Sequence, residues 1–206
     1  LDVSNSFGAF IINDIDGRAK IEVKFGSARI GKITHPDSRL RFDFSDPVEI
    51  SHLEHTAITA KYSKLKLTAA TEVKLISEFS NTEILGIGKL DAEIKFGSIN
   101  IKQAIKVMIK SNMASVEIEE LLEEGDFKPK YGSLTIDLFK KSMTRLVVDG
   151  EFSPIDIEIE EGASFNAEIS GSMASIKVPS DGWSEKEKDM NTKSFKGSFG
   201  QASENK

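Results

Sequence analysis

The chain has 206 residues, of which 39% are hydrophobic and 29% charged, and its formal net charge is −6. These values are ordinary for a globular protein with a buried core, and the mixture of acidic and basic residues excludes the clustered positive charge that nucleic-acid binding requires. The absence of cysteine excludes disulfides, thiolate metal sites and cysteine nucleophiles.

No apolar run approaches the roughly 20 residues that cross a bilayer as a helix, so we expect no membrane-spanning segment. The first residue is Leu1 rather than methionine, and it falls in the middle of a repeating pattern. We therefore expect the chain to be a mature or trimmed fragment.

One aromatic or methionine residue recurs along the whole chain at near-constant spacing. It is followed each time by Gly, Ser or Ala, and usually by apolar residues three and five positions beyond it. The steps between recurrences are 17–21 residues, except for a last step of 26. A period of this length is typical of solenoid proteins. In chain order the positions are Phe7, Phe25, Phe44, Tyr62, Phe79, Phe96, Met113, Tyr131, Phe152, Met173 and Phe199.

Alternating apolar and polar residues lie on both sides of each recurring position. Ile21 and Val23 precede Phe25, for example, and Ala28 and Ile30 follow it. Alternation is the period of a β-strand, and a unit this short buries its apolar face only by stacking on its neighbours. The sequence therefore predicts an all-β fold, a right-handed parallel β-helix (β-solenoid) of about ten coils with 17–21 residues per coil. An antiparallel sandwich is disfavoured, because it has no need to repeat the same residue types in register.

We expect residues 1–206 to form a single β-solenoid repeat domain. Residues 181–194 are polar, interrupt the spacing and predict an irregular loop. The only tryptophan, Trp183, lies in this segment and is the candidate exposed aromatic for binding, with a cap over the end of the core as the alternative. The pattern resumes at Phe195, which predicts a truncated final coil over 195–206.

The parity of the alternation predicts that the recurring aromatic faces the core. Phe25 shares the parity of Val23, whereas Ala28 shares that of Gly26. The phase therefore slips by one residue between the aromatic and the small residue, where a bend is expected. This favours an internal ladder of stacked rings, with Met113 and Met173 as flexible filler. The alternative is an exposed track for sugar rings, against which the methionines count.

Two outward rows are expected to flank this ladder on stacked coils. Residues just before the aromatic mostly alternate in charge sign, and such cross-strand neighbours disfavour slips of register. They are Lys24, Asp43, Lys61, Glu78, Lys95, Asn112, Lys130 and Glu151. Two residues beyond the aromatic, a partial serine ladder is predicted from Ser27, Ser98, Ser115, Ser133 and Ser175.

The sequence predicts no catalytic residues, no cofactor-binding residues and no metal site. Its three histidines, His35, His52 and His55, are expected to be ordinary loop residues, because a metal site needs convergent ligands and supporting partners. The acid-rich stretches are expected to be solvated loops, since they lack the spacing of a calcium loop. These stretches are Glu119, Glu120, Glu123, Glu124 and Asp126, and then Glu158, Glu160 and Glu161.

The repeated unit K-[FY]-[GS]-S-x-x-I occurs as KFGSARI at 24–30, KFGSINI at 95–101 and KYGSLTI at 130–136. Together with the closing FKGSFGQAS, it resembles the β-strand-repeat adhesin family of Bacteroidetes and related bacteria. The resemblance spans Phe7 to Phe199 and implies a β-helical fold and a secreted or envelope location. It supplies no functional residues to carry over.

We therefore expect a non-catalytic, adhesin-like binding module that is secreted or lies at the bacterial cell envelope and contacts a glycan or a cell-surface protein. One alternative is a carbohydrate-active enzyme of the pectate-lyase kind, which needs a cluster of carboxylates and basic residues on one face. Another is a structural filament whose solenoid ends stack. The sequence leaves the oligomeric state open.

Overall fold

The computed structural model describes residues 1–178, 183–188 and 191–199, and the described chain consists of strands and connecting turns. The strands are β1 (Asp2–Ile12), β2 (Lys20–Ile33), β3 (Ser38–Asp43), β4 (Val48–Lys61), β5 (Lys64–Glu78), β6 (Asn81–Lys130), β7 (Ser133–Phe139), β8 (Arg145–Glu151), β9 (Ile155–Ile159), β10 (Phe165–Ser172), β11 (Ile176–Lys177), β12 (Trp183–Lys188) and β13 (Thr192–Phe199).

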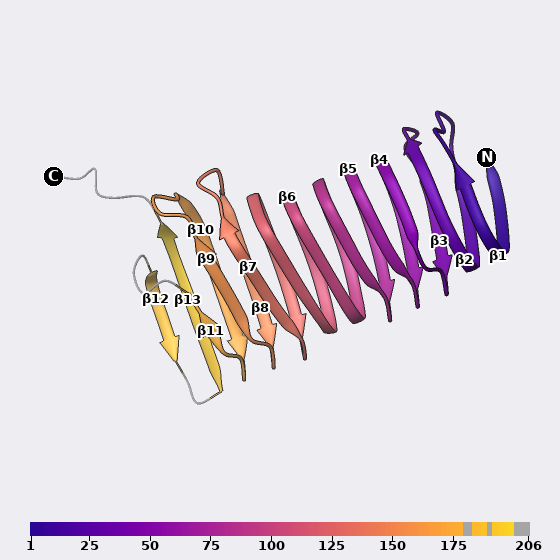
Figure 1. Ribbon diagram of the computed structural model, residues 1–206. Helices are drawn as coiled ribbons and strands as arrows, with labels where there is room; N and C mark the ends of the chain where they lie inside the picture. The colour runs from indigo at the N-terminus through magenta and orange to yellow at the C-terminus, as the bar shows by residue number, and fades with distance from the viewer. Residues whose placement is uncertain (179–182, 189–190, 200–206) are drawn as a thin grey trace.

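Successive coils lie side by side along one axis and pair in parallel (Figure 1). Lys64 of β5 pairs with Asn81 of β6, for example, and Ser115 of β6 pairs with Ser133 of β7. Side-chain hydrogen bonds between neighbouring coils join residues 17, 18, 20 or 21 positions apart. The fold is thus a β-solenoid of about ten turns, which confirms the predicted fold class, while the right-handed winding stays a prediction.

The core is a continuous apolar column inside the coils. In β2, the inward residues Ile21, Val23, Ala28 and Ile30 are all buried, and the polar residues between them face outward. The equivalent residues of the next coil cover each of these side chains, so the column extends along the rod. This is the burial that the alternating pattern predicts.

The recurring aromatic residues lie on the outside of the rod, so the predicted internal ladder is wrong. Phe25 is 50% exposed, whereas Val23, two residues earlier, is completely buried. The backbone at Phe25 has a φ of 52°, and all ten positions from Phe7 to Met173 have φ between 48° and 65°. This left-handed conformation turns the side chain away from the core. The phase therefore slips at the aromatic itself, not after it.

From the second coil onward, a glycine after the aromatic, such as Gly26, Gly97 or Gly132, lies against the backbone of the preceding coil. A Cβ atom on Gly97 would stand 2.1 Å from the carbonyl oxygen of Ser80. Where serine takes this position, its hydroxyl is buried: the Ser63 Oγ accepts from the Ser45 N–H at 3.0 Å and donates to the Lys61 carbonyl at 2.8 Å. We call these residues the buried serine set: Ser45, Ser63, Ser80 and Ser153.

The C-terminal end departs from parallel stacking. β13 pairs antiparallel with β10, and β12 pairs antiparallel with β13 (Figure 1). The described part of the predicted loop 181–194 thus contains β12 and the start of β13, and Phe195 to Phe199 return along the last coil instead of starting another. An antiparallel strand needs only a short connection to return along its neighbour. Residues 200–206 of the expected final coil lie outside the described residues.

Candidate binding surface

Ten exposed side chains form one continuous apolar row along an edge of the rod. Their exposed fractions run from 41% at Phe152 to 72% at Phe7. Nine steps of about 4.8 Å make the row roughly 43 Å long. We call it the aromatic ladder: Phe7, Phe25, Phe44, Tyr62, Phe79, Phe96, Met113, Tyr131, Phe152 and Met173. Large exposed apolar patches of this kind mark interaction surfaces.

The rings of the ladder stack on one another face to face. Between Phe7 and Phe96, the centroids of successive rings are 4.7–5.3 Å apart, and their planes differ by 3–14°. Tyr131 and Phe152 stack in the same way, at 4.9 Å. Each ring face inside a stack is therefore covered by its neighbour, and the ring edges are what solvent and partners meet.

Stacking also explains why aromatic residues occupy a backbone conformation that usually suits glycine. A left-handed conformation costs a side chain about 1–2 kcal/mol. A stacked aromatic pair contributes about 0.5–1.5 kcal/mol, and a ring such as Phe44 has two stacked neighbours. The stacking thus offsets the backbone strain at the corners that carry stacked rings.

Two of the predicted pairs between coils form just before the ladder, whereas Lys24 pairs with Glu22 and Asp43 pairs with Arg41 within their own strands. Lys61 Nζ lies 2.6 Å from a carboxylate oxygen of Glu78, and Lys130 Nζ lies 2.7 Å from one of Glu151. The Lys61 ammonium lowers the pKa of the Glu78 carboxyl below its ordinary value, and Glu151 raises the pKa of Lys130. We call this row, extended to Ser6 and Ser172 at its ends, the charge row.

The row on the other side of the ladder, two residues beyond each ladder position, is small and uncharged over most of its length. We call it the small polar row: Ala9, Ser27, Asp46, Lys64, Asn81, Ser98, Ser115, Ser133, Pro154 and Ser175. The Ser115 and Ser133 hydroxyls are 2.9 Å apart, and the Ser98 hydroxyl donates to the Asn81 side-chain oxygen at 3.0 Å. The predicted outer serine ladder therefore forms in part. The ladder stands between a row of alternating charge and a row of small polar groups.

The ion pairs between coils predict a pH window for stability. Lysine neighbours lower the pKa of glutamates such as Glu78 and Glu72 from 4.5, so their contribution is present above that value and is lost as the pH falls through the lower folded pKa. Lys130 and Lys177 have a pKa raised above 10.5, so their contribution is present below that value and is lost as the pH rises through the raised folded pKa.

We expect the thermal unfolding midpoint to form a plateau between these limits and to fall on both sides. Circular dichroism melts from about pH 3 to pH 11 measure this. In a second series at high salt, the midpoint should depend less on pH, because salt screens exposed ion pairs. A midpoint that rises on acidification below the plateau would contradict the assignment.

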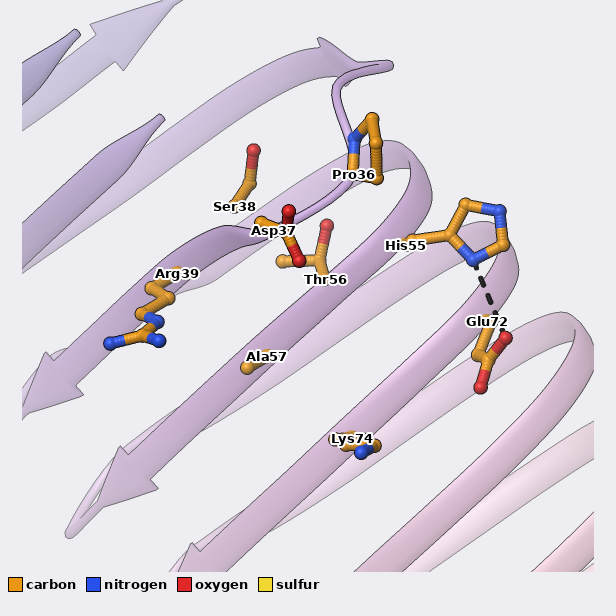
Figure 2. Close-up of a pocket in the computed structure, with 9 residues that line it drawn as sticks. All are labelled: Pro36, Asp37, Ser38, Arg39, His55, Thr56, Ala57, Glu72 and Lys74. Carbon is orange, nitrogen blue, oxygen red and sulfur yellow. Dashed lines mark ion pairs between the residues drawn. The ribbon is translucent and has the colours of Figure 1, made fainter. Parts of the chain in front are cut away.

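A second candidate feature is an open depression of about 560 Å³ on a face of the rod. Its lining includes Arg39, His55, Glu72 and Lys74 (Figure 2). His55 Nδ1 lies 3.4 Å from Glu72, and Lys89 Nζ lies 3.0 Å from the same carboxylate. Lys89 lowers the pKa of Glu72 most, and His55 lowers it further. These two neighbours therefore favour the ionised carboxylate.

The other two histidines have different neighbours. His52 and His55 lie in β4 and not in a loop, so that expectation was wrong for both. His52 is in register with Lys32 and Ala69 of the adjoining coils. The Nδ1 of His35 lies against the carbonyl oxygen of Pro36 in the turn before β3. In the part of the chain that the structure describes, no three His, Asp or Glu side chains are placed to hold a metal ion.

The first acid-rich stretch lies within β6, not in a loop, and pairs with cations on adjoining coils. Glu120 lies 3.1 Å from Lys140, and Lys106 lies 2.7 Å from Glu124 and 3.6 Å from Glu123. These neighbours lower the pKa of Glu120, where Gln103 contributes most, and of Glu124. Expecting a solvated loop there was wrong, because the strand alternation continues through these residues.

Trp183 packs against the end of the core and is not an exposed binding residue. It is half-buried, and its ring centroid lies 5.5 Å from that of Phe195 at an interplanar angle of 58°. Both residues belong to the antiparallel pair β12 and β13. The structure therefore favours the alternative, a cap over the last coil.

No family model, curated protein or solved structure matches the chain. Among the described residues there is no helix long and apolar enough to cross a membrane.

Proposed function

We propose that this chain is a non-catalytic, adhesin-like binding module, secreted or held at the bacterial cell envelope, and that the aromatic ladder is its contact surface. The observation that carries the proposal is the ladder itself, ten side chains at 41–72% exposure in one uninterrupted row. A rod of stacked coils presents such a row rigidly, so that many weak contacts add along its length. The resemblance of the repeated unit to the adhesin family supports the same location and role.

The exposed chemistry of the ladder favours a protein partner over a glycan. Sugar rings pack on the faces of aromatic rings, and within the stack those faces are covered at 4.7–5.3 Å. Ring edges instead suit the apolar side chains of a protein partner, which pack against them by burying apolar surface. Flanking charged and polar rows resemble the rim of a protein interface.

Carboxyl pKa values on the rod also support a binding role over glycoside or uronide chemistry. A general acid in glycoside cleavage needs a pKa raised above its ordinary value. Each glutamate with a shifted pKa in the described chain has it lowered by a hydrogen-bonded cationic or amide neighbour, as at Glu72 and Glu124. The lowered pKa values thus reflect ion pairs and hydrogen bonds on the surface of the stacked coils.

The proposal is tested by applying fluorescent beads coated with the chain to two arrays, one of glycans and one of bacterial surface proteins that includes the chain itself. We expect retention on protein spots. Replacing Phe79 and Phe96 with asparagine should reduce it by about tenfold or more, because central apolar anchors dominate interface affinity. Asparagine tolerates the left-handed corner, so the variant keeps the fold.

The matched control is Ile76→Thr, which removes an apolar side chain that is 44% exposed but lies off the ladder. It should leave retention unchanged. Release of reducing ends or unsaturated products from a panel of polysaccharides would contradict the non-catalytic role. Retention confined to glycan spots would contradict the protein partner.

A further inference from the structure

We propose that the partner of the aromatic ladder is a second copy of this chain, docked antiparallel so that the two ladders lie against each other over their whole length. The inference rests on the proposed function, in which the ladder is the contact surface. It adds the identity of the occupant, the direction in which it runs and the register.

The exposed area of the ladder matches what a stable dimer needs. An aromatic side chain presents about 150–250 Å², so ten side chains that are on average about half exposed present on the order of 1,000 Å² per copy. Covering most of this surface on both copies removes roughly 1,600 Å² from solvent, the size of a standard specific interface.

Symmetry decides which rows meet across such an interface. A two-fold axis in the contact plane and perpendicular to the ladder makes the two rods antiparallel. It also leaves each charge row on the same side, so the charge row of one copy faces the charge row of the other in reverse order. A two-fold axis along the ladder would make the rods parallel and set each charge row against the small polar row of the other copy.

Because the second copy runs in the opposite direction, residues of opposite charge in the two charge rows face each other. With all ten steps overlapping, Lys24 faces Glu151 of the second copy and Glu78 faces Lys95. Asp43, which lies opposite Lys130, is buried and bound to Arg41 of its own chain. The remaining neighbours are Ser6 with Ser172 and Lys61 with Asn112. No like charges meet in this register, whereas a shift by one coil sets lysine against lysine. Such complementarity selects direction and register.

The small polar row places no obstacle on the other side of the ladder. In the same arrangement Asp46 faces Ser133 of the second copy, and Lys64 faces Ser115. The only other charged or bulky element in this row is Pro154, which faces Ser27. At the centre, the edges of Phe79 and Phe96 meet those of Phe96 and Phe79 across the two-fold axis.

The test uses two charge reversals that lie far apart within one rod. Lys24 and Glu151 are seven coil steps from each other, about 34 Å, so they interact only between antiparallel copies. In sedimentation velocity the wild-type chain should dimerise with a micromolar dissociation constant. K24E and E151K should each weaken dimerisation by about tenfold or more, because each creates two like-charge contacts.

Mixing the two variants should restore the dimer. In the mixed pair, the carboxylate introduced by K24E faces the ammonium introduced by E151K, and the unchanged Lys24 of one copy faces the unchanged Glu151 of the other. Both contacts are therefore again of opposite sign. The double variant K24E/E151K should also dimerise like the wild type. Circular dichroism melts check that each variant is folded. Ile76→Thr serves as a control that keeps the dimer, and Phe79→Asn/Phe96→Asn should be monomeric.

A wild-type chain that stays monomeric at about 100 μM, some tenfold or more above a micromolar dissociation constant, overturns the inference. So does a dimer that is indifferent to K24E, or a mixture of K24E and E151K that dimerises no better than either variant alone. Binding of a monomeric chain to other protein spots, lost with Phe79→Asn/Phe96→Asn, would leave the proposed function standing without the self-pairing.

Discussion

Phe42→Ala is expected to lower the free energy of unfolding by about 3–5 kcal/mol, the usual cost of truncating a fully buried phenylalanine. Phe42 is completely buried in the column between coils. Its removal leaves a cavity that neighbours such as Val23 and Ala60 are too short to fill. Equilibrium denaturation in guanidinium chloride measures the change, read as a shift of the midpoint at constant slope.

The matched control for this prediction is Phe44→Ala, two residues along the chain. Phe44 is 50% exposed and stacks on Phe25 and Tyr62. Two stacked contacts account for about 1–3 kcal/mol, so this variant should be clearly more stable than Phe42→Ala. Equal costs for the two variants would place the ladder rings inside the core and refute the exposed ladder.

Ser63→Ala is expected to cost about 1–3 kcal/mol, because it leaves a buried backbone donor without an acceptor. The Ser63 Oγ accepts from the Ser45 N–H at 3.0 Å and donates to the Lys61 carbonyl at 2.8 Å, with the Phe42 carbonyl 3.3 Å away. Deleting the hydroxyl removes both hydrogen bonds at a corner that is closed to water. The same denaturation experiment reports the loss.

Ser133→Ala is the control for the buried hydroxyl. The Ser133 hydroxyl bonds to Ser115 at 2.9 Å in the outer row, where solvent replaces a lost partner. We expect a change within about 0.5 kcal/mol, as for most surface substitutions. If Ser63→Ala is as mild as Ser133→Ala, the hydroxyl does not support the corner.

The repeat could be predicted from the sequence because every coil forms the same strands and the same corner, and so needs similar residues at the same positions. Alternating residues such as Ile99 and Ile101 identify the inward face, and their recurrence in register identifies parallel stacking. The same reading located the corner at the aromatic and the small residue after it. It also found the paired charges before the ladder, since Lys61 and Glu78 hold the same place in consecutive coils.

The orientation of the ladder was not readable in the same way. Counting parity assumes an extended backbone at each residue, and that assumption fails at Phe25, where φ is 52°. A signal was present nonetheless: Tyr62 and Tyr131 carry hydroxyls that a closed apolar column would leave unpaired. The charged residue just before each ring from Phe25 onward also suits a side chain that faces water.

The sequence by itself determined that the coils stack in parallel and which aliphatic residues fill them, because both follow from local alternation and from a period that brings like residues together. Only the tertiary structure decided which way the rings point and how the last coil ends. The rings turn outward because the backbone at each takes a left-handed conformation, and small residues after them, such as Gly97, fit against the backbone of another coil, a contact between residues far apart in the chain. The antiparallel return of β13 likewise depends on an open edge at β10, which exists only once the coils have stacked.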